Sequence, residues 1–202
     1  MLHMDTRTKE LQHSKLYSEE LGIELARNDD AEYFKWFLAS TLFGGRISET
    51  IAKHTYQSFK RHDLLTPRKI LRAGWHYLVN PVMREGGYVH YDESKSRQIL
   101  RNSQQLLNEY GGSLQRLHEL AKDANDLESR LQIFHGIGPV TVNIFLRELR
   151  PYWRKANPEP LPVVQKIAKQ MSVDIESLNR KTVTFTRLEA GLIRLRKHTG
   201  NH

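Results

Sequence analysis

The fold is decided by residues 131–149, LQIFHGIGPVTVNIFLREL, in which two glycines flank one isoleucine and a proline follows. Gly136 and Gly138 permit backbone angles and close approaches that a Cβ forbids. Pro139 suits the first position of a helix, which makes Gly138 the N-cap of that helix. Apolar residues recur at helical spacing on both sides. The stretch therefore predicts two helices joined by a tight turn, with Ile137 packed back against both of them.

The predicted turn also has the chemistry of an anion site. The first N–H groups of a helix have no intrahelical acceptor, and they lie at the positive end of the helix dipole. Such groups suit one phosphate without any side-chain charge. An ordinary connection between two helices has the same local sequence, so both interpretations stay open on these residues alone.

The composition narrows the partners and excludes several kinds of site. The chain has 202 residues, with 31 Lys and Arg against 23 Asp and Glu, and a net charge of +8. This balance favours a polyanionic partner, or simply a charged surface. The absence of cysteine excludes disulfides, thiolate zinc sites and cysteine-ligated iron–sulfur clusters. The ten histidines show no metal-ligand spacing.

The sequence shows no membrane-spanning pattern. No apolar run approaches the roughly 20 residues that cross a bilayer, and the polar start is unlike a signal peptide. We therefore expect no membrane partner and an intracellular protein, either cytoplasmic or nucleoid-associated. No pattern in the sequence predicts an oligomeric state.

Nearly the whole chain has the periodicity of helices, which predicts an all-α fold. DDAEYFKWFLASTLF, residues 29–43, predicts a helix that Gly44-Gly45 ends. PYWRKANPEPLP, residues 151–162, holds four of the seven prolines and predicts an extended connector. We expect a short helix near residues 163–171. An extended segment at 181–186 should then lead to a last helix that begins near a Thr186–Glu189 capping box.

The arrangement L-x-x-F-x-G-I-G-P-x-T, residues 131–141, resembles the helix–hairpin–helix of a DNA glycosylase superfamily. This superfamily includes endonuclease III and the alkylbase glycosylases. FLASTLFGGRISETIAKHTYQSF, LTPRKILRAG and KSRQILRNSQQLLNEYGGSL resemble further parts of it and occur in its order and spacing. The resemblance covers about residues 30–150. The alternative is a helical DNA-binding domain that shares only the hairpin.

The resemblance implies a two-lobed helical DNA glycosylase fold. One lobe is a central helical bundle, residues 46–137, which leads into the hairpin, and the other combines residues 1–45 with residues 138–202. Double-stranded DNA would cross the cleft between them. The resemblance implies no cofactor except a monovalent cation on hairpin backbone carbonyls near His135 and Ile137. The residues expected to contact DNA are His135, Gly136, Ile137, Gly138, Val140, Thr141 and Arg46.

Enzymes of this superfamily flip a base out of the duplex and cut its N-glycosidic bond. Members that also cleave the strand carry a lysine two residues past the second hairpin glycine, where this chain has Val140. The resemblance therefore implies base excision without a lyase step. Valine has no amine, so it cannot form the Schiff base that strand cleavage requires.

The catalytic aspartate of the superfamily has no clear counterpart. It follows an apolar residue and a valine just ahead of a helix, and the best match places Gln165 there. Glu159 lies near the expected distance along the chain, and Asp174 lies one helix later. A solvated loop charge and a helix cap are the alternative roles of these two acids. The sequence thus leaves open a monofunctional glycosylase, a non-catalytic DNA-binding member of the fold, and a helical interaction domain that binds no DNA.

Other side chains are candidates for contact with DNA. Arg46 follows the break after the first helix, where its planar group suits phosphate or a base stack, although a surface arginine is equally expected there. Near the C-terminus, Arg187, Arg194 and Lys197 share one helix face, which is either solvated or bound to phosphate. Aromatic side chains stack on extruded bases. The candidates for a base pocket are Tyr88, Tyr91 and Trp153.

Overall fold

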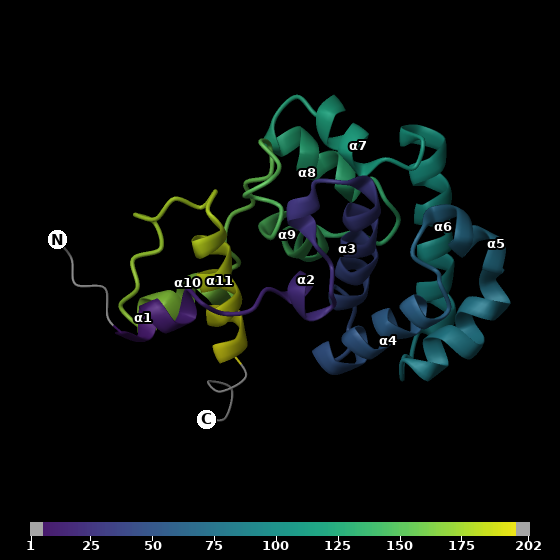
Figure 1. Ribbon diagram of the computed structural model, residues 1–202, viewed down its shortest axis with the longest axis horizontal. Helices are drawn as coiled ribbons and strands as arrows, with labels where there is room; N and C mark the ends of the chain where they lie inside the picture. Colours follow the sequence, from purple (N-terminus) through teal and green to yellow (C-terminus); the bar gives the residue numbers. More distant parts are fainter. Residues whose placement is uncertain (1–5, 197–202) are drawn as a thin grey trace.

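The computed structural model describes residues 6–196, and this part of the chain contains helices and no β-strand (Figure 1). The all-α prediction is therefore confirmed. No helix in the described part is both long and apolar enough to cross a bilayer. In chain order the elements are α1 (Thr6–Leu11), α2 (Tyr17–Glu20), η1 (Leu25–Arg27), α3 (Asp30–Phe43), α4 (Glu49–Arg61), α5 (Pro67–Tyr77), η2 (Leu78–Met83), α6 (Asp92–Tyr110), α7 (Leu114–Leu120), α8 (Ala124–Gln132), α9 (Pro139–Arg147), α10 (Pro162–Gln170) and α11 (Val183–Leu195).

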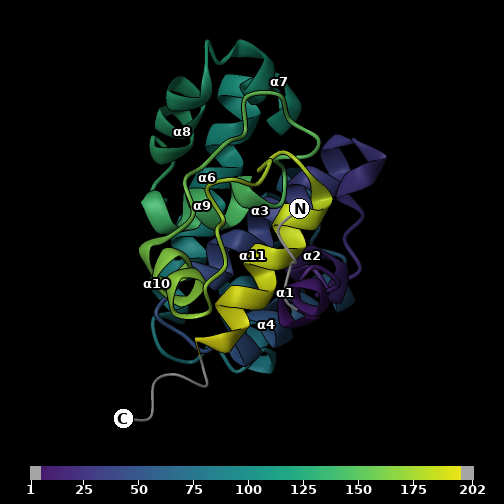
Figure 2. The same cartoon turned by 90° about the vertical axis from the view of Figure 1, so that its left-hand side faces the viewer.

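Helices α3 and α9 pack against each other in the middle of the molecule. Helix α3 also contacts α4 and α7, and α9 contacts α8. Beyond them, α5 and α6 form a pair on one side, whereas α1, α10 and α11 lie together on the other (Figure 1). Figure 2 shows α1 and α10 on either side of α11. The first and last helices of the chain thus belong to the same group.

Short polar side chains fix the starts of the helices. Asp29 caps α3 by accepting from the N–H of Glu32, and Ser48 caps α4 by accepting from the N–H of Ile51. The start of α11 differs from the prediction, because Thr182 accepts from the N–H of Phe185 and the helix begins at Val183. The predicted extended segment at 181–186 is therefore mostly helix.

Aromatic rings hold α3, α9 and the connector together. The ring of Phe37 lies 5.4 Å from Phe134 and 5.5 Å from Phe145, both nearly edge to face. The indole N–H of Trp36 donates to the carbonyl of Phe145 at 3.0 Å. Trp153 meets Phe145 at 5.6 Å. Because such contacts have directional preferences, they fix α9 and the turn before it relative to α3.

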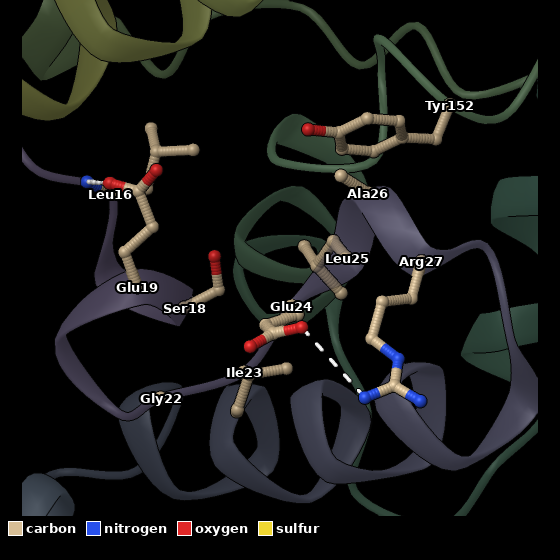
Figure 3. Close-up of a pocket in the computed structure, with 10 residues that line it drawn as sticks. All are labelled: Leu16, Ser18, Glu19, Gly22, Ile23, Glu24, Leu25, Ala26, Arg27 and Tyr152. Atoms are coloured by element: carbon tan, nitrogen blue, oxygen red, sulfur yellow. Dashed lines mark hydrogen bonds and ion pairs between the residues drawn. The ribbon is translucent and has the colours of Figure 1, made fainter.

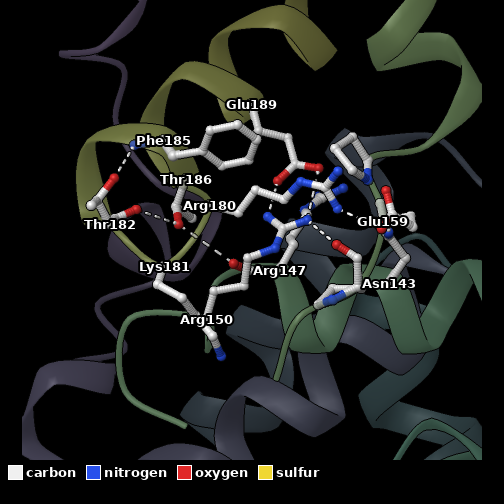
Figure 4. Close-up of polar contacts among 12 residues, drawn as sticks. Asn143, Arg147, Arg150, Glu159, Arg180, Lys181, Thr182, Phe185, Thr186 and Glu189 are labelled. Carbon is white, nitrogen blue, oxygen red and sulfur yellow. Dashed lines mark hydrogen bonds and ion pairs between the residues drawn. The ribbon is translucent and has the colours of Figure 1, made fainter. Parts of the chain in front are cut away.

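A buried ion pair ties the proline-rich connector to α11 (Figure 4). The guanidinium of Arg150 donates to both carboxylate oxygens of Glu189 and to the carbonyl of Pro158, and the side chains of the pair are 0% and 1% exposed. The ammonium of Lys181 donates to the carbonyls of Trp153, Arg154 and Ala156. The connector thus has a defined path although it is not helical.

Removing one partner of the buried pair should destabilise the fold strongly. Arg150→Met leaves the carboxylate of Glu189 buried without its cation, and we expect a loss of about 3–5 kcal/mol in the free energy of unfolding. Urea denaturation measures this loss. The double variant Arg150→Met/Glu189→Leu should recover most of the stability, and a double variant as unstable as the single one would contradict the assignment.

Candidate nucleic-acid interface

The segment between α8 and α9, residues 133–138, forms a tight turn that we call the Gly136 turn. Gly136 has a φ of +67°, and a Cβ on it would lie 2.7 Å from Nε2 of Gln98. Gly138 has a φ of −97°, and a Cβ there would meet nothing within 4 Å. Ile137 is buried in the core, as predicted, whereas His135 and Gly136 are exposed. The first glycine is thus required by the backbone and the second is not.

The Gly136 turn is held in place by α6. The carbonyl of His135 accepts from Nε2 of Gln98 and from Nδ2 of Asn102, both at 3.0 Å. The imidazole of His135 lies 3.2 Å from the guanidinium of Arg101. A carbonyl oxygen has two lone pairs, and two amide donors use both. This arrangement argues against the expected monovalent cation at the oxygen of His135.

Three backbone N–H groups at the start of α9 are available to a ligand. The N–H of Ile137 donates to Phe134 within the turn, and Pro139 has no N–H. The N–H groups of Gly138, Val140 and Thr141 have no acceptor among residues 6–196. Pro139 and Val140 are exposed, so this helix end faces solvent. Backbone amides and the helix dipole together make the position attractive to an anion.

Thr141 differs from the prediction in one respect. Its side chain is buried and packs against Gly44, where a Cβ would come within 2.0 Å of the threonine hydroxyl. The hydroxyl therefore does not reach a ligand, and only the N–H of Thr141 remains available. The contact explains why the turn after α3 has a glycine at position 44.

A cleft of about 410 Å³, the turn cleft, opens beside the Gly136 turn. Residues that are far apart in the sequence meet there. The predicted contact residues Arg46, Tyr91 and His135 share the cleft with side chains of α6 that the sequence did not single out. The lining residues are Gly44, Gly45, Arg46, Tyr88, Tyr91, Ser94, Lys95, Gln98, His135 and Gly136.

Lys95 supplies a partly buried cation to the turn cleft. Its ammonium donates to Oε1 of Gln98 at 2.6 Å and to the carbonyl of Thr41 at 3.3 Å. Burial lowers the pKa of Lys95 to about 8. The group is still protonated at neutral pH, and with Arg46 and Arg101 it places three cationic side chains near the turn. Nothing in the sequence distinguishes Lys95 from the other lysines of the chain.

The three aromatic residues predicted to stack on a base differ in their exposure to solvent. Tyr91 is 69% exposed at the edge of the turn cleft. Tyr88 lines the same cleft but is only 2% exposed, and burial raises the pKa of its hydroxyl. Trp153 is also 2% exposed and stacks on His118 at 4.6 Å, so its prediction as a base-pocket residue is wrong. The connector folds this ring into the core although charged residues flank it in the sequence.

The residue predicted at the acid position lies inside a helix. Helix α10 begins at Pro162 with Leu161 as its N-cap, so Gln165 is not ahead of the helix. The side-chain amide of Gln165 donates to the carbonyl of Pro160 at 3.2 Å. The residue that precedes α10 is thus a leucine, whose side chain carries no charge.

The two remaining acid candidates have structural partners. The carboxylate of Glu159 is 71% exposed and pairs with Arg180 at 2.5 Å (Figure 4). Asp174 caps a turn by accepting from the N–H groups of Glu176 and Ser177 at 3.2 and 3.3 Å. Glu159 and Gln165 also line an open groove of about 720 Å³ that reaches Val140. Asp174 therefore caps a turn and not the helix that its alternative role required, and Glu159 is partly neutralised.

A second, smaller pocket lies on the other side of Val140, and we call it the Tyr17 pocket. It has a volume of about 130 Å³. The rings of Tyr17 and Phe43 meet edge to face at 5.6 Å, and Glu49 is the carboxylate of the lining. The sequence did not single out this pocket, because Glu49 resembles any acidic residue in the first turn of a helix. The lining residues are Tyr17, Phe43, Ile47, Glu49, Val140, Ile144, Arg147, Leu161, Val163, Ile193 and Arg196.

Contacts with distant residues place Tyr17 in this pocket. The carboxylate of Glu148 accepts from the N–H groups of Tyr17 and Ser18 at 2.9 and 3.0 Å. Glu148 is 1% exposed, and burial raises the pKa of this carboxyl. The cations of Arg194 and Arg147 lie 4.4 and 5.3 Å from the centre of the Tyr17 ring. The N-terminal segment is therefore fixed by α9 and α11.

The C-terminal arginines are paired with α2. Arg187 binds the carboxylate of Glu19 through two nitrogens, and Arg194 pairs with Glu20 at 2.9 Å. Neither of the two expected arrangements, a solvated face or a phosphate-binding face, describes these side chains. Lys197 lies outside the described residues. The acids of α2 could not be assigned to these arginines from sequence, because about 170 residues separate them.

A further groove of about 550 Å³ follows the N-terminal segment from Leu16 to Arg27 and ends at Tyr152 (Figure 3). It shares no lining residue with the turn cleft or the Tyr17 pocket. Its carboxylates are those of Glu19 and Glu24, and Arg27 pairs with Glu24 at 3.8 Å. Because its carboxylates outnumber its cations, this groove does not favour the binding of a nucleic-acid phosphate backbone.

No family model matches the chain, and neither a curated protein nor a solved structure matches it. In the described part, no group of three or more His, Asp or Glu side chains is arranged to hold a metal ion.

The two glycines of the turn should respond differently to the same substitution. Gly136→Ala forces alanine into a left-handed conformation, which costs roughly 1–2 kcal/mol, and it also displaces Gln98. Gly138→Ala has open space and an ordinary φ, so its cost should stay below about 1 kcal/mol. Chemical denaturation compares the two variants. Equal losses would contradict the described turn.

Lys95 should give the stability a distinct dependence on pH. The unfolded chain keeps this proton up to its usual pKa of 10.5, whereas the folded protein releases it near 8. The unfolded state therefore binds more protons in this window, and stability should rise with pH by about 1–2 kcal/mol between about pH 7.5 and about pH 9.5. Lys95→Gln should remove this rise. Urea denaturation at several pH values measures it, and an unchanged slope in the variant would refute the assignment.

Proposed function

We propose that the protein binds double-stranded DNA through the Gly136 turn and acts as a base-excision DNA glycosylase. In this proposal it belongs to the helix–hairpin–helix superfamily. It hydrolyses the N-glycosidic bond of a flipped damaged base and carries out no lyase step. The observation that carries the proposal is the exposed start of α9, where three N–H groups have no protein acceptor within residues 6–196. A DNA substrate also places the protein in the cytoplasm or at the nucleoid.

The surroundings of the turn support a phosphate as the ligand. Backbone amides bind phosphate without depending on the base sequence, which suits contact with DNA of any sequence. Arg46 and Lys95 line the adjacent cleft, and Arg101 contacts His135 of the turn. The net charge of +8 favours association with a polyanion. These features favour a DNA-binding protein over a helical interaction domain.

The order of the elements supports the two-lobed interpretation. The break after α3 and the turn before α9 reach the same cleft, and Gly44 contacts Thr141 directly. In Figure 1, α10 and α11 lie to the left of α3 and α9, whereas α5 and α6 lie to the right. DNA laid across the turn cleft would contact both groups of helices.

A non-catalytic DNA-binding member of the same fold is the second candidate. The observation that favours it is Leu161 at the N-cap of α10, with Gln165 one turn later, where the superfamily has its aspartate. Neither side chain can stabilise a positive charge on the sugar. This candidate and the first share the phosphate contact and differ only in whether a base is removed.

Gly138→Asp tests the phosphate contact without disturbing the fold. The new carboxylate can accept from the free N–H groups of α9, which caps the helix and adds up to about 1 kcal/mol of stability. The same carboxylate repels a phosphate, so affinity for a duplex should fall by at least about tenfold, or about 1.4 kcal/mol. Fluorescence anisotropy with a labelled undamaged duplex measures the affinity.

Gly138→Ala is the matched control, because it adds a Cβ without a charge and should bind nearly as the wild type does. Affinity of the wild type should also fall steeply between about 50 mM and about 200 mM salt. Unchanged duplex affinity in Gly138→Asp would refute the phosphate contact. Binding that does not respond to salt would favour a partner other than DNA.

A further inference from the structure

Val140 connects the Gly136 turn with the Tyr17 pocket. Its N–H is one of the three without an acceptor within residues 6–196, and its side chain is 54% exposed and lines the pocket. A phosphate bound to this N–H would therefore bring the sugar and base of the same nucleotide to the mouth of the pocket. The two features lie within one turn of α9.

The Tyr17 pocket has the size and lining of a site for one flat ring. Its volume of about 130 Å³ is several times the share of a single water, roughly 30 Å³. Aromatic rings stack on nucleobases, and the partly exposed ring of Phe43 supplies one such surface, with the buried ring of Tyr17 packed against its edge. The groove beside Glu159 is less suitable, because it has no aromatic lining and a volume of about 720 Å³.

Glu49 places one carboxylate in this otherwise mostly apolar pocket. It is the first residue of α4, and its side chain is 16% exposed. The ammonium of Lys53 lies 2.8 Å from Glu49 and 2.5 Å from Glu20. Burial alone would lower the pKa of Lys53, but its hydrogen bonds to Glu20 and Glu49 raise it. Lys53 thus places a cation directly beside the carboxylate of Glu49.

We propose that the Tyr17 pocket receives a nucleobase turned out of the duplex and that Glu49 is the catalytic carboxylate that removes it. This inference rests on the proposed function and specifies the site of the reaction. Glu49 accepts a proton from a water molecule, whose oxygen forms the new bond to the sugar C1′. The bond between C1′ and the base nitrogen breaks, and its electron pair leaves with the base, which then takes up a proton.

The charges of the pocket indicate the class of base. Arg147 and Arg196 line it together with Glu49, so guanidinium groups outnumber carboxylates. They would repel an alkylated base that carries a positive charge. They can donate to carbonyl oxygens and stabilise a base that leaves with negative charge. The pocket therefore suits a neutral base with carbonyl groups, such as uracil or hypoxanthine, rather than 7-methylguanine.

Glu49→Gln separates excision from DNA binding. Duplexes with one uracil, hypoxanthine or 7-methylguanine are incubated with excess protein, and alkali then cleaves the abasic sites. The wild type should excise uracil or hypoxanthine, and Glu49→Gln should be slower by about 100-fold or more, the usual contribution of a general base. Its affinity for an undamaged duplex should match the wild type. Glu109→Gln, an exposed carboxylate on α6, is the matched control and should change neither quantity.

Val140→Trp tests the pocket without altering Glu49. The substitution is at an exposed position, so the fold should persist, but the indole should block the mouth of the pocket and abolish excision. Full excision by Glu49→Gln or Val140→Trp would overturn the inference and leave DNA binding intact. A wild type that binds the duplex and excises no base would also overturn it in favour of the non-catalytic candidate. Preferred excision of 7-methylguanine would overturn the assigned class of base, and absence of duplex binding would overturn the proposed function itself.

Discussion

The position of the Gly136 turn depends on the two hydrogen bonds that Gln98 and Asn102 donate to the carbonyl of His135. They fix the Gly136 turn to α6, and this close approach leaves no room for a side chain at position 136. The carbonyl of His135 points toward α6, and the N–H groups of Gly138, Val140 and Thr141 have no acceptor among residues 6–196.

Local signals in the sequence predict the local structure well. The periodicity of residues 29–43 and the Gly-Ile-Gly-Pro turn both describe features whose cause lies within a few residues. Predictions fail where contacts with residues far away in the sequence determine the position of a side chain. Trp153 follows a proline and precedes two basic residues, yet Tyr33, His118 and Phe145 draw its ring into the core. The extended segment predicted before α11 is helical because Thr182, and not Thr186, provides the cap.

The residues of the candidate site also fall into those that the sequence predicts and those that it does not. Arg46, Tyr91 and the turn itself were predicted from sequence, because each lies at a recognisable break between helices. Glu49 and Tyr17 were not, since their importance comes from the docking of the N-terminal segment. That docking depends on Glu148, whose carboxylate binds N–H groups 131 and 130 residues away. Burying this carboxylate costs free energy, which its two hydrogen bonds and the nearby Arg147 partly offset. No local pattern reveals such an arrangement.

The packing of α1 and α2 against α11 has a consequence for the order in which the protein takes shape during translation. Chains emerge from the ribosome beginning at the N-terminus, and the segment around Tyr17 is made long before α11. Its partners Arg187 and Arg194 arrive only with the last helix. The Gly136 turn and α6 are complete earlier, so a nascent chain can assemble the turn cleft first. The pocket closes last, when the two ends of the chain come together.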